Sequence, residues 1–121
     1  MRGTTRDPER LADIEAAGAE AVLADPDRLG TLTTQLAGVS VVCWLLATVP
    51  SPDLHGPRLE TLLERLVDTP VRGFVYEGGA GAAAVRAASE RWHLPAQVIE
   101  QDPAAHEAWL AALRAAVAEL L

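Results

Sequence analysis

Hydrophobic positions along the chain follow two patterns, one typical of short strands and the other of amphipathic helices. Residues 41–47 form the longest apolar stretch and do not alternate with polar residues, which predicts a strand over residues 40–47 that is covered on both faces. We interpret it as the central strand of a sheet. Shorter apolar stretches predict further strands at residues 20–24, 71–76 and 96–100.

Between these strands, apolar residues recur at three- and four-residue intervals, the spacing of one face of an α-helix. The pattern predicts helices over residues 8–17 and 26–36, a third that ends before Thr69, and an alanine-rich fourth that reaches Trp92. A last helix follows Asp102. The expected core-facing residues are Leu11 and Ile14, then Leu29, Leu32 and Leu36, then Leu59, Leu62, Leu63 and Leu66, and finally Leu110, Leu113, Val117 and Leu120 or Leu121.

Three Asp-Pro pairs, which begin at Asp7, Asp25 and Asp102, each precede a helical stretch. An aspartate can accept hydrogen bonds from the first amides of a helix, and proline at the first helical position loses no hydrogen bond. Each pair therefore predicts a helix start, with Asp27 as a competing cap at the second pair. Gly18 and Gly38 are expected to end the first two helices.

Strict alternation of strands and helices predicts a parallel sheet with right-handed crossovers. We therefore expect an α/β fold, a three-layer sandwich with a mostly parallel sheet, in one domain over residues 1–121. Residues 48–57 contain three prolines and are expected to form a loop.

Composition narrows the functions open to such a domain. The formal charge of −7 argues against nucleic-acid binding, which normally needs a basic face. No apolar stretch is long enough to cross a membrane, and the amino-terminal residues lack the apolar core of a signal peptide, so we expect a cytoplasmic protein. The single cysteine, Cys43, is expected to be a small buried hydrophobe.

All ten basic residues are arginines, and the chain contains no lysine. This excludes Schiff-base chemistry, a phosphate-loop lysine and the Ser-Lys or Tyr-Lys catalytic pairs. The three histidines lack the spacing of a metal site. Ser51, Asp53 and His55 supply the residue types of a hydrolase triad, but their adjacency in a proline-rich loop argues against that geometry. The three tryptophans are expected to pack in the core rather than to stack on nucleic acid.

One segment matches a phosphate-binding loop. Residues 79–84 fit the pattern G-x-G-x-x-G/A, follow a predicted strand and open a predicted helix, and Glu100 lies about twenty residues further on. Gly79 and Gly81 are therefore candidate contacts for a dinucleotide. The alternative is that Gly78 and Gly79 only make the tight turn between strand and helix, in an alanine-rich segment that matches by chance.

The amino-terminal sequence RGTTRDPERL, followed by GAEAV and Ala24-Asp25, resembles NAD(P)-binding Rossmann-fold proteins of the nucleoside-diphosphate-sugar epimerase and atypical short-chain dehydrogenase type. In that pattern these segments are the second strand, its helix and the third strand, and residues 39–47 and 71–77 are the fourth and fifth strands. The resemblance implies that Arg6 holds the 2′-phosphate of NADP, that Asp25 contacts the adenine, and that Ala47 lies beside the cofactor. Arg6 as a solvated side chain and Asp25 as a helix cap are the alternatives.

Departures from this family are extensive. The first strand and its glycine-rich turn, which hold the pyrophosphate in Rossmann proteins, have no counterpart, and the chain starts after them. Tyr76 is the only tyrosine, Ala80 stands where the catalytic lysine is expected, and Gly78-Gly79 replaces a serine pair. The usual dehydrogenase or epimerase chemistry is therefore not expected.

The missing first strand is central in the usual strand order, so its loss would leave two strand edges unpaired. The sheet could close, another chain could supply the strand, or the sequence could be part of a longer product, in which case a strand and glycine-rich loop would be encoded upstream of Met1. We expect a catalytically incomplete protein that retains weak affinity for NADP or NAD. The alternative is a non-enzymatic interaction module or homodimer formed through exposed sheet edges or helix faces.

Overall fold

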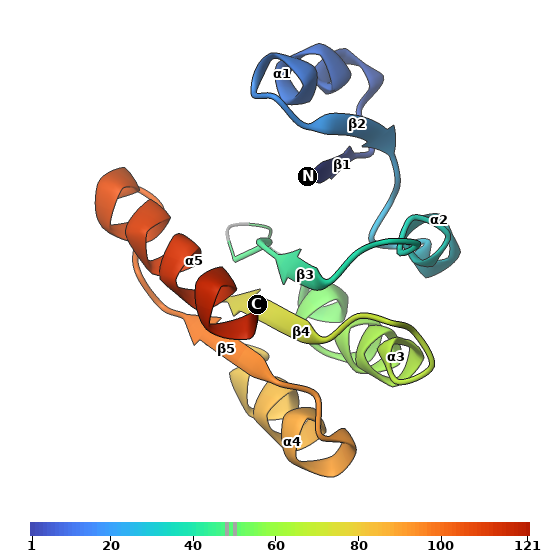
Figure 1. Cartoon of the computed structure of the whole chain (residues 1–121), viewed down its shortest axis with the longest axis vertical. Helices are drawn as coiled ribbons and strands as arrows, with labels where there is room; N and C mark the ends of the chain where they lie inside the picture. The colour runs from blue at the N-terminus through green and yellow to red at the C-terminus, as the bar shows by residue number, and fades with distance from the viewer. Residues whose placement is uncertain (48, 50) are drawn as a thin grey trace. The chain divides into compact units, whose positions relative to one another are not determined.

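The computed structural model describes residues 1–47, 49 and 51–121, and shows helices and strands in alternation (Figure 1). Part of the loop predicted over residues 48–57, namely Thr48 and Pro50, lies outside the described residues. The strands are β1 (Arg2–Thr5), β2 (Glu20–Leu23), β3 (Val41–Trp44), β4 (Gly73–Glu77) and β5 (Ala96–Ile99). The α-helices are α1 (Leu11–Ala16), α2 (Leu29–Thr33), α3 (Pro57–Leu66), α4 (Ala82–Trp92) and α5 (His106–Leu120), and two 3₁₀ turns are η1 (Pro8–Arg10) and η2 (Pro52–His55).

The described strands form two parallel sheets, and the chain divides into two compact units, Met1–Leu36 and Ala37–Leu121. The first unit holds the β1–β2 sheet, in which Arg2 lies opposite Glu20 and Thr5 lies opposite Leu23. Helix α1 connects the two strands, with Leu11 and Ile14 half-buried as the sequence predicts, and Gly18 follows its end with a φ of 89°. The expectation of one domain over the whole chain stays a prediction.

The second unit is a three-layer α/β structure. Its sheet has the order β3-β4-β5 with all strands parallel. Helix α5 packs against β4 and β5 on one face, and α3 and α4 pack together on the other face (Figure 1). The predicted α/β class, with parallel strands between helical layers, is confirmed.

Strand β4 divides the core of this unit between the two faces of the sheet. Because successive residues of a strand point to opposite faces, Val75 lies with Ala116 and Leu120 of α5, whereas Phe74 and Tyr76 belong to the other face. All five residues of β4 are buried. The leucine stripe predicted for the third helix is buried as expected and consists of Leu59, Leu62, Leu63 and Leu66.

The prediction that residues 40–47 form the central strand is wrong. Strand β3 covers only Val41–Trp44 and lies at an edge of its sheet, and β4 is central. Cys43 is exposed rather than buried. A continuous apolar run shows that a strand contacts apolar neighbours, but the order of strands in a sheet depends on pairings that are distant in sequence.

The Asp-Pro pairs also act differently from the prediction at two of three positions. Asp7 does cap a helical turn, since its side chain accepts from the Glu9 amide at 3.0 Å. Asp25 and Asp102 also accept from the amide two residues later, but no helix begins at the following proline, and their helices begin only at Leu29 and His106. An Asx turn satisfies the aspartate locally, so the helix starts later than the proline suggests.

The second helix is also shorter than the predicted 26–36, because α2 ends at Thr33. The Thr31, Thr33 and Thr34 hydroxyls donate to backbone carbonyls three residues earlier in the chain. Threonines that bond to the local backbone in this way weaken the helix interior.

Candidate functional site

The candidate site is an open pocket at the carboxyl ends of β3 and β4, within the second unit. Its volume is about 540 Å³, and pockets that bind small molecules measure roughly 300 to 1,000 Å³. Ligands of open parallel sheets commonly bind beyond the carboxyl ends of the strands. The described lining comprises Ala47, Val49, Ser51 and Pro52 after β3, His55 of η2, Tyr76 of β4, and Gly78, Gly79 and Ala80 after β4.

Two of the lining residues, His55 and Tyr76, form a hydrogen-bonded network that connects three segments of the chain. The His55 Nδ1 atom lies 2.6 Å from the Tyr76 hydroxyl oxygen, and His55 Nε2 lies 3.1 Å from the Leu46 carbonyl oxygen. The Gly81 amide donates to the same Tyr76 hydroxyl at 2.8 Å. The network therefore ties η2 to the end of β3 and to the start of α4.

Donor and acceptor roles in this network are mutually consistent. The Leu46 carbonyl can only accept, so His55 carries a hydrogen on Nε2. Tyr76 accepts from the Gly81 amide, and its hydroxyl shares a second hydrogen bond with His55 Nδ1. Both ring nitrogens are thus occupied by protein groups. His55 holds the pocket wall in place and has no nitrogen left to act as an acid or base on a ligand.

Tyr76 is completely buried, and its environment favours the neutral phenol. Burial raises the pKa of Tyr76 above its usual value of 10.0, and the Gly81 N–H bond, which would stabilise a phenolate, acts in the opposite direction. The hydroxyl is therefore a stable hydrogen-bond connector near neutral pH.

Gly81 does not lie in the pocket lining, although the sequence pattern made it a candidate cofactor contact. A Cβ atom at Gly81 would lie 2.7 Å from the Tyr76 hydroxyl and 2.6 Å from Leu59 Cδ2. Its amide is already bonded to Tyr76. The glycine is thus explained by close packing, and its N–H is unavailable to a phosphate.

Gly79 and Ala47, two other candidates from the sequence, do line the pocket. Gly78, which precedes Gly79, has a φ of 108°, a conformation that is strained for a residue with a side chain. A Cβ at Gly78 would lie 3.2 Å from Ala47 Cβ. A Cβ at Gly79 would meet no described atom within 4 Å. The turn after β4 therefore leaves open space over Gly79.

A buried acidic side chain, Glu77, stands behind the pocket wall. It is 4% exposed, accepts from the Ala47 amide at 3.1 Å, and accepts from the indole Nε1–H of Trp109 on α5. Each carboxylate oxygen thus has a donor. Glu77, which directly precedes Gly78, therefore connects Ala47, in the segment after β3, to Trp109 on α5.

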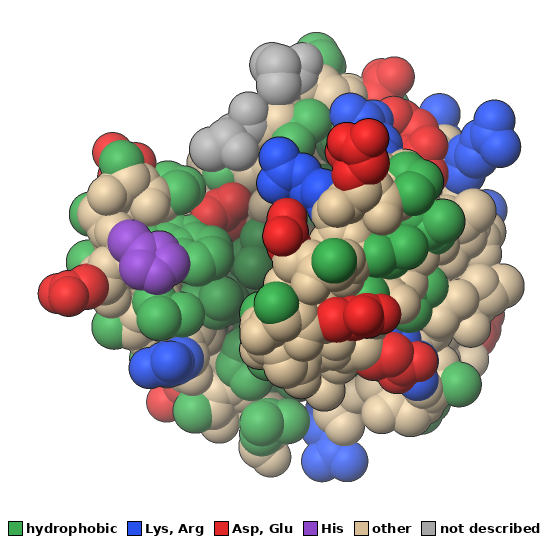
Figure 2. All heavy atoms as spheres, turned by 90° about the horizontal axis from the view of Figure 1, so that it is seen from above, with side chains coloured by type: hydrophobic (Ala, Val, Ile, Leu, Met, Phe, Trp, Pro, Cys, Tyr) green, Lys and Arg blue, Asp and Glu red, His purple; other side chains and the backbone are tan. Residues whose placement is uncertain are grey.

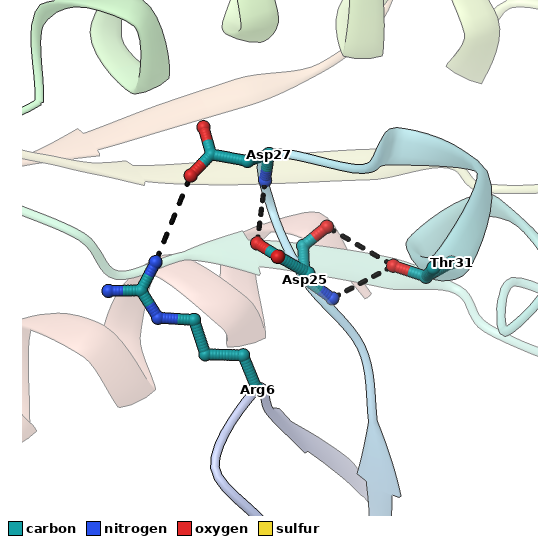
Figure 3. A network of polar contacts seen from close by, with 4 residues as sticks. All are labelled: Arg6, Asp25, Asp27 and Thr31. Atoms are coloured by element: carbon teal, nitrogen blue, oxygen red, sulfur yellow. Dashed lines mark hydrogen bonds and ion pairs between the residues drawn. The ribbon is translucent and has the colours of Figure 1, made fainter.

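The remaining candidates, Arg6 and Asp25, lie in the first unit and form a polar network with Asp27 and Thr31 (Figure 3). The Arg6 guanidinium lies 3.8 Å from the Asp27 carboxylate. Asp25 accepts from the Asp27 amide at 2.9 Å, and the Asp25 amide donates to the Thr31 hydroxyl at 2.8 Å. The structure brings Arg6 and Asp25 into one network, in which Asp25 shapes the turn after β2.

The described parts of the chain also bear on nucleic-acid binding, metal binding, a hydrolase triad and membrane spanning. Acidic and basic side chains are interspersed on the face shown in Figure 2, without a single basic patch. Among residues 1–47, 49 and 51–121, no group of histidine, cysteine and acidic side chains could hold a metal ion. His55 is hydrogen-bonded to Tyr76 rather than to the Ser51 or Asp53 side chain of the rejected triad. Within the described residues, no helix is long and apolar enough to span a membrane.

Compared with models of known protein families and with curated protein sequences, the chain matches none of them.

Sequence reasoning missed the three residues that organise this site: His55 and Tyr76 at the pocket, and Glu77 behind it. In the sequence, His55 stands out only as a metal or triad candidate, and Tyr76 only as a residue that does not fit a catalytic motif. One available signal is Glu77, a charged residue at the end of an apolar strand, since a polar group there needs partners when it is buried. The partners themselves come from segments about thirty residues away.

Proposed function

We propose that this protein is a catalytically incomplete, Rossmann-like domain that binds a nucleotide such as NADP or NAD weakly at the carboxyl ends of β3 and β4. The observation that carries the proposal is the pocket itself, which lies where parallel α/β sheets bind ligands and includes Ala47 and Gly79. The resemblance of the chain to nucleoside-diphosphate-sugar epimerase-like proteins supports the same ligand class.

The chemistry of the pocket supports binding without catalysis. Both nitrogens of His55 are hydrogen-bonded within the protein, and the hydroxyl of Tyr76 is bonded to both His55 and Gly81. The chain also has no lysine to lower the pKa of a catalytic tyrosine. Weak affinity is expected because the Gly81 amide, part of the predicted phosphate loop, is not available. The cytoplasmic location expected from the sequence remains part of this proposal.

Titration of the purified chain with NADPH and NADH tests it, with tryptophan fluorescence as the readout. Trp44 is a suitable reporter because its buried indole donates to the Leu54 carbonyl at 3.1 Å, next to His55 of the pocket wall. We expect a saturable change at millimolar cofactor, after correction with free tryptophan for absorption by the ligand. A linear response identical to that of free tryptophan would remove the binding proposal.

A second candidate function is self-association through β3. This strand is at the edge of its sheet, with one strand partner among the described strands, and its Cys43 is exposed. Unpaired strand edges are sites at which another chain can add a strand. Sedimentation velocity over a wide concentration range tests this: a mass that doubles with concentration supports a homodimer, and a constant monomer mass rejects it.

A further inference from the structure

Strand β3 has one edge that no described strand pairs with, and the hydrogen bonds around it show which residues form that edge. The Ser40 carbonyl, just before β3, accepts from the Arg72 amide at 2.8 Å, so the backbone groups of Ser40 face the β4 side. Backbone N–H and C=O groups of successive strand residues point to opposite sides of the strand. Those of Val41 and Cys43 therefore point away from β4.

The pairing of β4 leads to the same assignment. The Phe74 amide donates to the Pro95 carbonyl at 3.0 Å, toward β5, so the backbone of Phe74 does not face β3. Phe74 lies opposite Val42 in the register. In a parallel ladder, Val42 then bonds to the residues on either side of Phe74. The groups of β3 that remain unpaired among the described strands are again those of Val41 and Cys43.

The side chains along this edge form a short apolar set. Val41 and Leu45 pack against the core cluster that contains Ala116 and Leu120 of α5 but are only half-buried, and Cys43 between them is exposed. Because side chains alternate between the two faces of a strand, all three lie on the same face, which α5 covers only in part. We call Val41, Cys43 and Leu45 the open edge.

The open edge lacks the features that normally prevent strand pairing. Edge strands are usually protected by charged side chains, proline or a bulge. Residues 40–47 contain no charged residue and no proline. A partner selected by charge would find nothing to recognise here, whereas a second copy of the same edge brings no charge of its own into the contact.

The open edge is also complementary to itself. A dimer of identical edges has a two-fold axis, so its two strands run antiparallel. With the axis at Cys43, Val41 of one copy lies opposite Leu45 of the other, and the two Cys43 residues face each other. An axis at Val42 or Trp44 would leave one member of the open edge without a partner from this set. Only the axis at Cys43 pairs all three residues with one another.

We propose that a second copy of this chain pairs with the open edge, antiparallel and with the two-fold axis at Cys43, so that one sheet continues across both copies. The inference rests on the self-association proposed above and defines its partner and register. Val41 and Leu45 of the two copies then shield each other from water. Each chain has a net charge of −7, so salt screens the repulsion between copies and should strengthen the dimer.

Disulfide cross-linking of the whole chain tests the position of the axis. Residues directly opposite in an antiparallel pair have Cα atoms roughly 5.5 Å apart, within the range of roughly 4.4–6.8 Å that a disulfide spans. Diamide, a thiol oxidant, should therefore join two copies of the chain through Cys43. Cys43→Ser is the matched control, which should remain dimeric in sedimentation velocity but should not cross-link.

A mixture of two variants tests the register independently of Cys43. In the Cys43→Ser background, Val41→Cys and Leu45→Cys place one thiol at either end of the open edge. The mixed chains should cross-link to each other, because these positions lie opposite across the dimer. Either variant alone should cross-link poorly, since its two thiols are then separated by roughly 14 Å along the strands.

A charge placed at the axis tests the interface by affinity. Cys43 is exposed, so Cys43→Arg should fold, which circular dichroism verifies. Two arginines would face each other at the axis, and this repulsion should weaken the dimer by roughly tenfold or more. Cys43→Ser, which adds no charge, should leave the affinity nearly unchanged.

The outcomes distinguish this register from self-association in general. Cross-linking of Val41→Cys or Leu45→Cys alone that equals cross-linking of the mixture would overturn the register and leave self-association through β3 standing. A dimer that Cys43→Arg does not weaken would place the interface elsewhere and overturn both. A constant monomer mass at every protein and salt concentration would also reject both, without bearing on nucleotide binding.

Discussion

The hydroxyl of Tyr76 connects the loop before α3, the end of β3 and the start of α4 through bonds to His55 and Gly81. The sequence does not predict either of these hydrogen bonds, because in it Tyr76 is simply the last aromatic residue of an apolar strand. A strand pattern predicts that such a residue is buried, but its hydrogen-bond partners depend on where the neighbouring turns are folded.

Tyr76 should titrate only at high pH. Burial raises the pKa of this phenol in the folded protein above 10.0, so the folded state prefers the neutral form and unfolding makes ionisation easier. The stability that Tyr76 contributes is complete below pH 10 and is lost as the pH rises through the raised pKa of the folded state. Because the chain has one tyrosine, phenolate absorbance reports this residue directly.

We expect a midpoint above 10 in the folded protein that returns to the usual value in urea. Tyr76→Phe is the control, since it should show no phenolate signal and a smaller loss of stability in alkali. Identical midpoints with and without urea would contradict the effect of burial.

Replacing Glu77, even with glutamine, should lower the stability of the protein. In Glu77→Gln, the side-chain NH₂ group must face either the Ala47 amide or the Trp109 indole N–H, and both of these are donors. One buried donor then lacks its acceptor, which costs about 1–3 kcal/mol. Urea denaturation measures the cost, and a shift in tryptophan emission shows whether the Trp109 environment changes.

Trp109→Phe provides the comparison, because it removes the indole donor. Glu77→Gln should cost less in that background, since its amide can orient its oxygen toward Ala47. Equal costs in both backgrounds would show that the Trp109 bond does not contribute.

At the scale of elements, α5 packs closely on the glycine at the start of β4. A Cβ at Gly73 would lie 2.9 Å from Leu120 Cβ, so α5 packs directly on the glycine backbone. The sequence predicted α3 and the apolar stripe of α5 because both have a regular three- and four-residue spacing. It did not predict the position of β3 at an edge, or the late starts of α2 and α5, because these depend on strand order and on local Asx turns.

Gly73→Ala should therefore destabilise the second unit. The added methyl group must displace α5 or β4, and such overpacking typically costs about 1–3 kcal/mol. Gly79→Ala is the matched control: its methyl group enters open space, so its effect on unfolding should be small. Chemical denaturation of both variants gives the comparison, and equal stabilities would contradict the packing argument.

At the scale of the whole chain, the two units differ greatly in how much core they contain. The second unit has a complete three-layer core on both faces of its sheet, whereas the buried hydrophobic residues of the first unit are Ala24 and Leu29 among those described. A two-stranded sheet with short helices seldom buries enough apolar surface to fold independently.

We expect a polypeptide of residues 37–121 to unfold cooperatively by itself and one of residues 1–36 to be unstructured alone. Circular dichroism and amide exchange of the two polypeptides measure this difference. A residue 37–121 polypeptide without a cooperative transition would show that its core requires the amino-terminal unit.

By itself, the sequence pattern determined the α/β class, the five main helices, four of the five strands and the buried stripe of α3, because periodicity and turn residues act locally; β1 was implied only by the family resemblance. It also excluded lysine chemistry outright. Tertiary structure alone decided that β4 is central, that Gly81 is committed to Tyr76, and that Ala47, His55 and Gly79 share one pocket. The Gly81–Tyr76 bond joins residues five positions apart across a turn, and the other features require residues more than twenty positions apart to meet. Such contacts depend on strand order and helix packing rather than on local pattern.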